Sequence, residues 1–172
     1  HQIPYFEHEL GTSAQTGAFL ISTSSLIAMF SRWGFGYLAD IIDMRLLLSA
    51  IGVICSISFF VLAGLNMIDT PTWQIWSFPI LYGIGYGGMM PVNFAFLGSR
   101  FGSKNIGSIQ GLQGVGSMVS NTSIPILIGF TLDATGSRAP GFLAIAFALA
   151  LVPLMSMMIP KDFSMSTSKK GA

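Results

Sequence analysis

Charged side chains are scarce in this sequence, and they fall only between long uncharged stretches or at the two ends of the chain. Lys, Arg, Asp and Glu make up 9% of the chain, against about 25% in a typical soluble domain. A water-soluble core built from 172 residues would need a charged shell around it. Because the sequence cannot supply that shell, it predicts a chain whose apolar surface faces a lipid bilayer.

Five uncharged stretches are long enough to cross a membrane as helices. A spanning helix needs about 20 mainly apolar residues, and in lipid its backbone amides must be bonded within the segment. The stretches cover residues 13–31, 46–65, 73–97, 107–132 and 141–159. The sequence therefore predicts an all-α integral membrane fold. It has an extracytoplasmic segment over 1–12, a five-helix bundle over 13–160 and a cytoplasmic tail over 161–172.

The basic residues predict how the bundle is oriented. If the helices alternate in direction, Arg138 falls on one side and every other Lys and Arg falls on the opposite side. Because basic residues collect on the cytoplasmic side, we expect a multi-pass protein of the cell membrane with its N-terminal end outside and its C-terminus in the cytoplasm. The odd number of spans, with a start at His1 rather than Met, leads us to expect a further helix upstream.

Amide side chains lie within the third and fourth stretches, where lipid would make them costly. Four of them are Asn93, Gln110, Gln113 and Asn121. Two explanations remain open for each: contact with a solute in a central cavity, or a hydrogen bond to another helix.

The same two stretches are rich in glycine. Gly83 and Gly87, and likewise Gly107 and Gly111, are four residues apart, a spacing that allows two helix backbones to approach closely. The run 83–88 lies inside a span and follows no strand, so it is not a phosphate-binding loop.

Other classes of protein are disfavoured. Cys55 is the only cysteine, and His1 and His8 lie outside the spans without a paired ligand, so we expect no metal site. No nucleotide-binding motif or catalytic constellation is present, which predicts neither a cofactor nor an enzyme. A net charge of +1 without a basic, aromatic-containing block gives no sign of a nucleic-acid partner.

Residues 36–45 read Gly-Tyr-Leu-Ala-Asp-Ile-Ile-Asp-Met-Arg. This segment resembles the signature loop of the major facilitator superfamily, in which a glycine, an aspartate and a final base recur at fixed spacing. Gly36, Asp40 and Arg45 match that pattern, whereas Ile41 stands where a base is usual and Asp43 where a glycine is usual. The resemblance implies a loop between two helices whose charges latch one conformation of a transporter.

Residues 101–111 and 129–137 are similar to the two flanks of helix 11 in the same superfamily. Together with the loop, they imply helices 8 to 12 of a twelve-helix transporter, with Ile3-Pro4-Tyr5 trailing from a lost helix 7. On this interpretation the N-terminal half of the same protein is the missing partner, and the fragment alone is inactive.

Arg32 lies one helical turn before Gly36. Monocarboxylate-transporter-like members of the superfamily carry an arginine there that engages the substrate carboxylate, and a guanidinium suits bidentate recognition of that group. Those members place an aspartate one turn earlier, where this sequence has Ala28. The alternative is that Arg32 only anchors the cytoplasmic end of its helix.

The leading hypothesis is a secondary active transporter that moves a small solute by alternating access. An organic anion such as a monocarboxylate is the expected substrate, with a coupled ion as a second candidate partner. Arg32 and the four amides are the expected substrate-binding residues. The alternative is a receptor or assembly scaffold that has a transporter-like fold and transports nothing.

Overall fold

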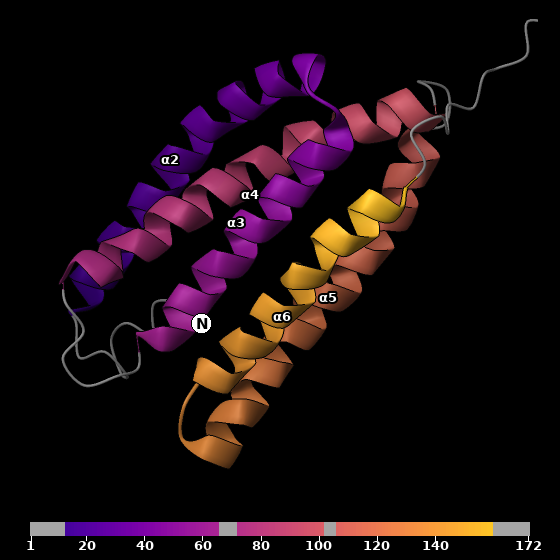
Figure 1. The fold of residues 1–172 in the computed structure, drawn as a ribbon. Coiled ribbons are helices and arrows are strands. Elements are labelled where there is room, and N and C mark those ends of the chain that lie inside the picture. The colour runs from indigo at the N-terminus through magenta and orange to yellow at the C-terminus, as the bar shows by residue number, and fades with distance from the viewer. Residues whose placement is uncertain (1–12, 66–71, 102–105, 160–172) are drawn as a thin grey trace, which may run out of the picture.

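The computed structural model describes residues 13–65, 72–101 and 106–159. This part of the chain forms five helices without a strand (Figure 1): α2 (Ala14–Ile41), α3 (Met44–Gly64), α4 (Thr72–Phe101), α5 (Ile106–Thr135) and α6 (Ala139–Met158). The expected all-α fold is confirmed. The predicted N-terminal segment, with its two histidines, and the predicted tail lie outside the described residues.

Helix α2 is longer than the sequence predicts. Ser13 caps its start, and the Ser13 hydroxyl accepts a hydrogen bond from the backbone N–H of Thr16 at 3.1 Å. The helix then continues through the segment expected to be a loop, and only Ile42 and Asp43 separate it from α3. The expected break at 32–45 was wrong because charged side chains do not end a helix, and this stretch contains no proline.

Four of these helices, α3 to α6, are both long and apolar enough to span a membrane. The exception is α2, which has 28 residues and so a length of about 42 Å, but whose composition is more polar. Its run of hydroxyl residues 22–25 bonds to carbonyl oxygens one turn back, as when Ser22 donates to Ala18 at 2.9 Å. Such internal bonds satisfy the hydroxyl groups without water.

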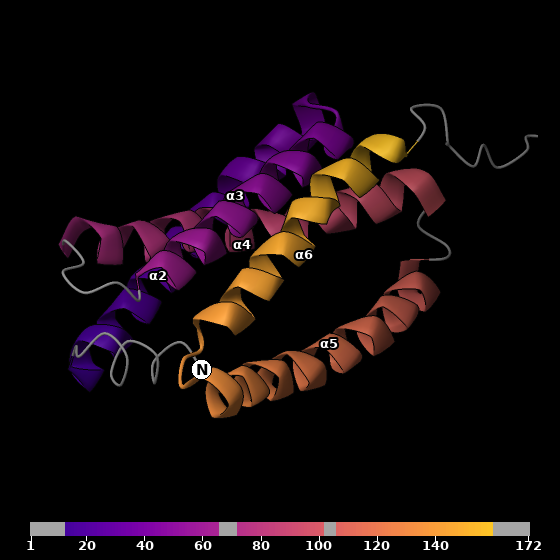
Figure 2. The same ribbon diagram turned by 60° about the horizontal axis from the view of Figure 1, so that its bottom comes forward.

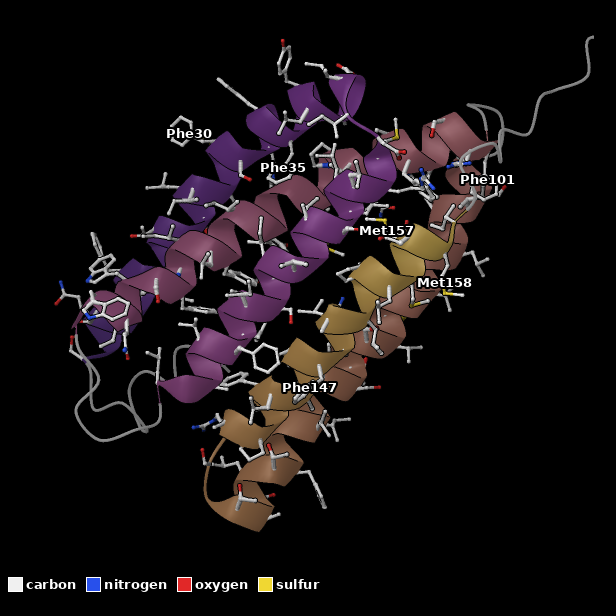
Figure 3. All side chains as sticks on the ribbon, in the orientation of Figure 1. Phe30, Phe35, Phe101, Phe147, Met157 and Met158 are labelled. Carbon is white, nitrogen blue, oxygen red and sulfur yellow. The ribbon has the colours of Figure 1, made fainter. Side chains whose placement is uncertain are left out.

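The helices pack in the order α2, α4, α3, α6 and α5, with each one against the next (Figures 1 and 2). Large apolar side chains cover much of the outside, including Phe30, Phe147 and Met158, which are 64%, 62% and 82% exposed (Figure 3). An apolar exterior of this kind is what a lipid-facing bundle requires.

Close contact between α2 and α4 depends on glycine. A Cβ atom added to Gly83 would lie 2.6 Å from the carbonyl oxygen of Ser24, and one added to Gly87 would overlap the carbonyl oxygen of Ala28. Ser31 reinforces the contact, since its hydroxyl donates to the carbonyl oxygen of Ile84 at 2.6 Å. The first glycine pair therefore has the role that its spacing predicted.

Helix α5 is the least covered helix, and Ile128 is its one buried residue. Figure 2 shows it bowed and set apart from α2 and α4 along much of its length. A Cβ atom added to Gly107 or Gly111 would meet nothing within 4 Å. The close approach expected at this second glycine pair is absent because the described helices leave that part of α5 open.

One serine pair and one arginine join α3 to α6. The Ser49 and Ser156 hydroxyls are hydrogen-bonded at 2.6 Å. At the start of α3, Arg45 donates to the Asp43 carboxylate at 2.6 Å and to the carbonyl oxygen of Ile159 at 2.8 Å. Arg45 is buried, and it ties the beginning of α3 to the end of α6.

We expect Arg45→Ala to destabilise the protein, because it removes the bonds to Asp43 and Ile159. The expected loss in free energy of unfolding is on the order of 1–3 kcal/mol, measured as a fall in melting temperature of the intact protein in detergent. Asp40→Asn is the matched control, since Asp40 is exposed. Equal melting temperatures for Arg45→Ala and the wild type would contradict the structural role of Arg45.

Candidate functional site

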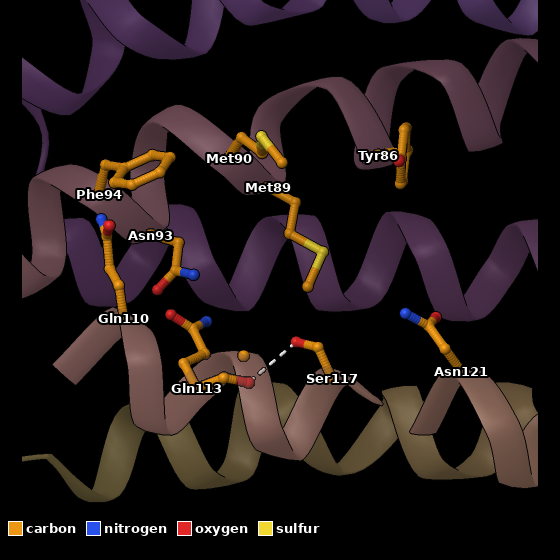
Figure 4. Close-up of a pocket in the computed structure, with 10 residues that line it drawn as sticks. Tyr86, Met89, Met90, Asn93, Phe94, Gln110, Gln113, Ser117 and Asn121 are labelled. Carbon is orange, nitrogen blue, oxygen red and sulfur yellow. Dashed lines mark hydrogen bonds between the residues drawn. The ribbon is translucent and has the colours of Figure 1, made fainter. Parts of the chain in front are cut away.

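A cavity of about 450 Å³ lies between α4 and α5 (Figure 4). Every residue that lines it comes from one face of one of these helices: Tyr86, Met89, Met90, Asn93 and Phe94 from α4, and Gln110, Gln113, Gly114, Ser117 and Asn121 from α5. Residues three and four apart share one face of a helix, which explains how residues scattered over 36 positions of the sequence meet at one cavity.

The four amides singled out in the sequence all line this cavity. Figure 4 shows Asn93 on α4 and Gln113 on α5 extending toward each other. Ser117 donates to the backbone carbonyl of Gln113 at 3.0 Å, which leaves that side-chain amide unused. No hydrogen bond joins any of the four side-chain amides to another described residue. The four amides therefore border a cavity and are not bonded to another described helix, while contact with a solute stays a prediction.

A second cavity of about 240 Å³ lies between α2 and α4. Its lining includes Arg32, the hydroxyl residues Ser24 and Ser25, and the rings of Tyr82 and Tyr86. Ala28 also lines it, at the position where the resembling transporters carry an aspartate. The guanidinium of Arg32 thus has a cavity beside it and no acid in the described lining.

Tyr86 lines both cavities. The structure therefore brings all five expected substrate-binding residues to two cavities that share one side chain. Between them, Arg32 is the only charged residue of the described lining. The arrangement can hold a solute with one anionic group, several hydrogen-bonding groups and an apolar body.

The expected latch residues lie elsewhere and are not brought together as a charge cluster. Asp40 is exposed in the last turn of α2. A Cβ atom on Gly36 would lie 4.0 Å from that of Pro91 on α4, an ordinary contact distance. Arg45 pairs with Asp43, so its partner is the residue that departs from the superfamily pattern.

The sequence did not predict the aromatic and sulfur-containing part of the lining. Tyr86, Met89, Met90 and Phe94 line the larger cavity beside Asn93. Their positions in the sequence could have indicated a role, since all four lie within two helical turns of Asn93. Apolar residues are usual in a membrane-spanning helix, so the residue types alone predicted no role in a site.

The described residues contain no group of three or more His, Cys, Asp or Glu that could hold a metal ion.

Comparison with known proteins gives one broad match and two partial ones. The model of the Major Facilitator Superfamily matches residues 2–172. The multidrug resistance protein B homologs of Mycobacterium tuberculosis strains CDC 1551 / Oshkosh and ATCC 25618 / H37Rv are each 28% identical over 85 residues. That segment is 49% of this chain and 16% of each relative. No solved structure matches the chain significantly.

Proposed function

Since the chain belongs to the Major Facilitator Superfamily, a family of multi-pass membrane transporters, we propose that it is the solute-binding part of a secondary active transporter. The solute is a small organic anion, and transport proceeds by alternating access. Arg32 binds the anionic group, and Asn93, Gln110, Gln113 and Asn121 bind its polar substituents.

One observation carries this proposal: five polar side chains chosen from sequence alone line two cavities that share Tyr86. Asn93 and Gln110 are half-buried, and the other three are exposed on the described helices. Polar groups within a spanning bundle are costly unless they have a function or a partner. The lining holds one cation and no Asp or Glu. An anion gains a favourable partner there, whereas an organic cation would be repelled.

The two mycobacterial relatives are described as multidrug resistance protein homologs. Their description offers a second class of solute, an apolar drug-like compound, and the rings and methionines around the larger cavity suit its body. We favour the anion because Arg32 borders the adjoining cavity without a counter-charge in the described lining.

The working transporter includes a second helical half, which covers the exposed face of α5. Transporters of this type bind solute near the middle of the membrane, at the interface between two related halves. An almost fully exposed α5 that carries three cavity-lining amides suits such an interface. The chain lies in the cell membrane with its N-terminal end outside and its C-terminus in the cytoplasm, with a coupled ion driving transport.

The test is uptake by the intact protein in proteoliposomes. Pyruvate and benzoate serve as anionic probes, ethidium as a cationic probe and glucose as a neutral one, each with and without an imposed proton or sodium gradient. We expect accumulation of at least one acid. If ethidium alone is transported, the proposal that the solute is an anion is wrong. If the folded protein transports none of the four probes, the result favours a receptor or scaffold.

The proposed latch gives a separate prediction. A carboxylate in the last turn of a helix is disfavoured by the helix dipole, so Asp40 is a group that would gain from a cation brought near it in another conformation. We expect Asp40→Asn to change the transport rate several-fold while the melting temperature stays the same. Unchanged rates and unchanged protease accessibility of the cytoplasmic side would remove Asp40 from the conformational cycle.

A further inference from the structure

Three aromatic rings form a column along α4. Phe78, Tyr82 and Tyr86 are spaced by four residues, about one helical turn. The ring centroids of Phe78 and Tyr82 are 5.4 Å apart with an interplanar angle of 20°, and those of Tyr82 and Tyr86 are 5.4 Å apart at 13°. The column begins in the core, where Phe78 is fully buried, and ends at Tyr86, which is 47% exposed.

The inner part of the column is held in place by α3. The ring of Phe59 meets Tyr82 edge-on at 5.9 Å and 90°, and it meets Phe78 at 6.2 Å and 71°. Tyr82 in turn stacks on Tyr86, and no other described ring contacts Tyr86. One face of Tyr86 is therefore fixed by the protein, and the ring is oriented before any solute arrives. A pre-oriented ring loses little freedom on binding.

Tyr86 places an aromatic ring in the same cavity as the charged side chain of Arg32. Tyr86 lines the smaller cavity with Arg32 and Tyr82, and it lines the larger cavity with Met89 and Met90. A solute anion bound to Arg32 therefore lies in the same small cavity as the phenol ring. The rest of the solute extends past that ring into the larger cavity, where thioether sulfur atoms make favourable contacts with aromatic rings.

We infer that the transported anion is an aromatic carboxylate, whose ring packs against Tyr86 while its carboxylate binds Arg32. This inference rests on the proposed function and narrows its substrate class. Arg32 and Tyr86 line the same small cavity, about 240 Å³ in volume, so the carboxylate is attached directly to the ring or close to it. The amides of the larger cavity then bind hydroxyl or carbonyl substituents at the far side of the ring.

A pair of matched probes tests the inference on the unmodified protein. Benzoate and cyclohexanecarboxylate carry the same charge and nearly the same bulk, but only benzoate is flat and aromatic. We expect benzoate to inhibit pyruvate uptake, or to be taken up, with a preference of about 3- to 10-fold, which is what ring stacking contributes. Equal potency of the two acids overturns the aromatic inference and leaves an anion transporter standing.

A variant pair locates the effect at Tyr86. Tyr86→Leu is expected to remove the preference for benzoate over cyclohexanecarboxylate, whereas Tyr86→Phe keeps the preference because the ring remains. A preference that survives in folded Tyr86→Leu protein would overturn the role of this ring. Failure of every acid in the wild-type protein would instead overturn the proposed function, so the two failures are distinguishable.

Discussion

Replacing Arg32 with glutamine is expected to reduce carboxylate uptake by the intact protein at least about 30-fold. Loss of one partner of a hydrogen-bonded charge pair that is buried in the complex typically costs 2–5 kcal/mol, and each 1.4 kcal/mol is about a factor of ten in affinity. Arg32 is the one charged group of the described cavity lining, so no neighbouring charge in that lining can replace it. The measurement is the initial rate of labelled pyruvate and benzoate uptake into proteoliposomes.

Arg100→Gln is the matched control for Arg32→Gln. Both residues are basic and belong to helices that the charge pattern orients with these ends in the cytoplasm, but Arg100 lies over the ring of Phe96 and lines neither cavity. We expect Arg100→Gln to transport normally. If Arg32→Gln protein, inserted in the same orientation, transports like Arg100→Gln, then Arg32 is only a cytoplasmic anchor. Arg32→Lys should retain part of the activity, because lysine keeps the charge and loses the bidentate geometry.

A single methyl group at Gly87 is expected to force α2 away from α4. The added Cβ atom of Gly87→Ala would overlap the carbonyl oxygen of Ala28 and lie 2.7 Å from the Cβ atom of Ser31. Because backbone atoms cannot rotate away, the helices must move, and the nearby bond from Ser31 to Ile84 is strained with them. Overpacking of this kind costs about 1–3 kcal/mol, a fall in melting temperature of about 2–12 °C for a chain of this size.

Gly111→Ala is the control, since a Cβ atom there meets nothing within 4 Å among the described residues. Alanine is the better helix former by about 1 kcal/mol, so the melting temperature should stay level or rise. If both substitutions lower the melting temperature by similar amounts, then any substitution in these helices is harmful. In that case the close approach at Gly87 does not explain the loss.

Much of the fold could be predicted because membrane helices are specified by local composition. Uncharged stretches of about 20 residues are recognisable one at a time, and the helix pattern confirms them. Helix ends are less predictable, as α2 shows by continuing to Ile41. The end of a helix depends on its capping interactions, and the capping residue of the next helix, Asp43, sits later than the first charges suggest.

The residues of the candidate site also divide into those that the sequence predicted and those that it did not. Asn93 and Gln113 could be predicted as site residues by residue type alone, because amides are costly in lipid. Arg32 could be predicted from its charge and from the superfamily resemblance. The sequence did not predict Tyr86 as a site residue, because an aromatic residue is ordinary in a membrane-spanning helix. Its importance comes from lying between two cavities, a property of three packed helices.

The sequence by itself determined the membrane class, the helical content, the superfamily and the polar groups that need a partner, because each depends on composition or on short spacing. Only the tertiary structure decided how those helices face one another. It brought Gly83 and Gly87 against α2 while leaving Gly107 open, and it paired Arg45 with Asp43. The physical reason is that contact between two helices depends on their relative rotation and offset, which neither helix encodes alone.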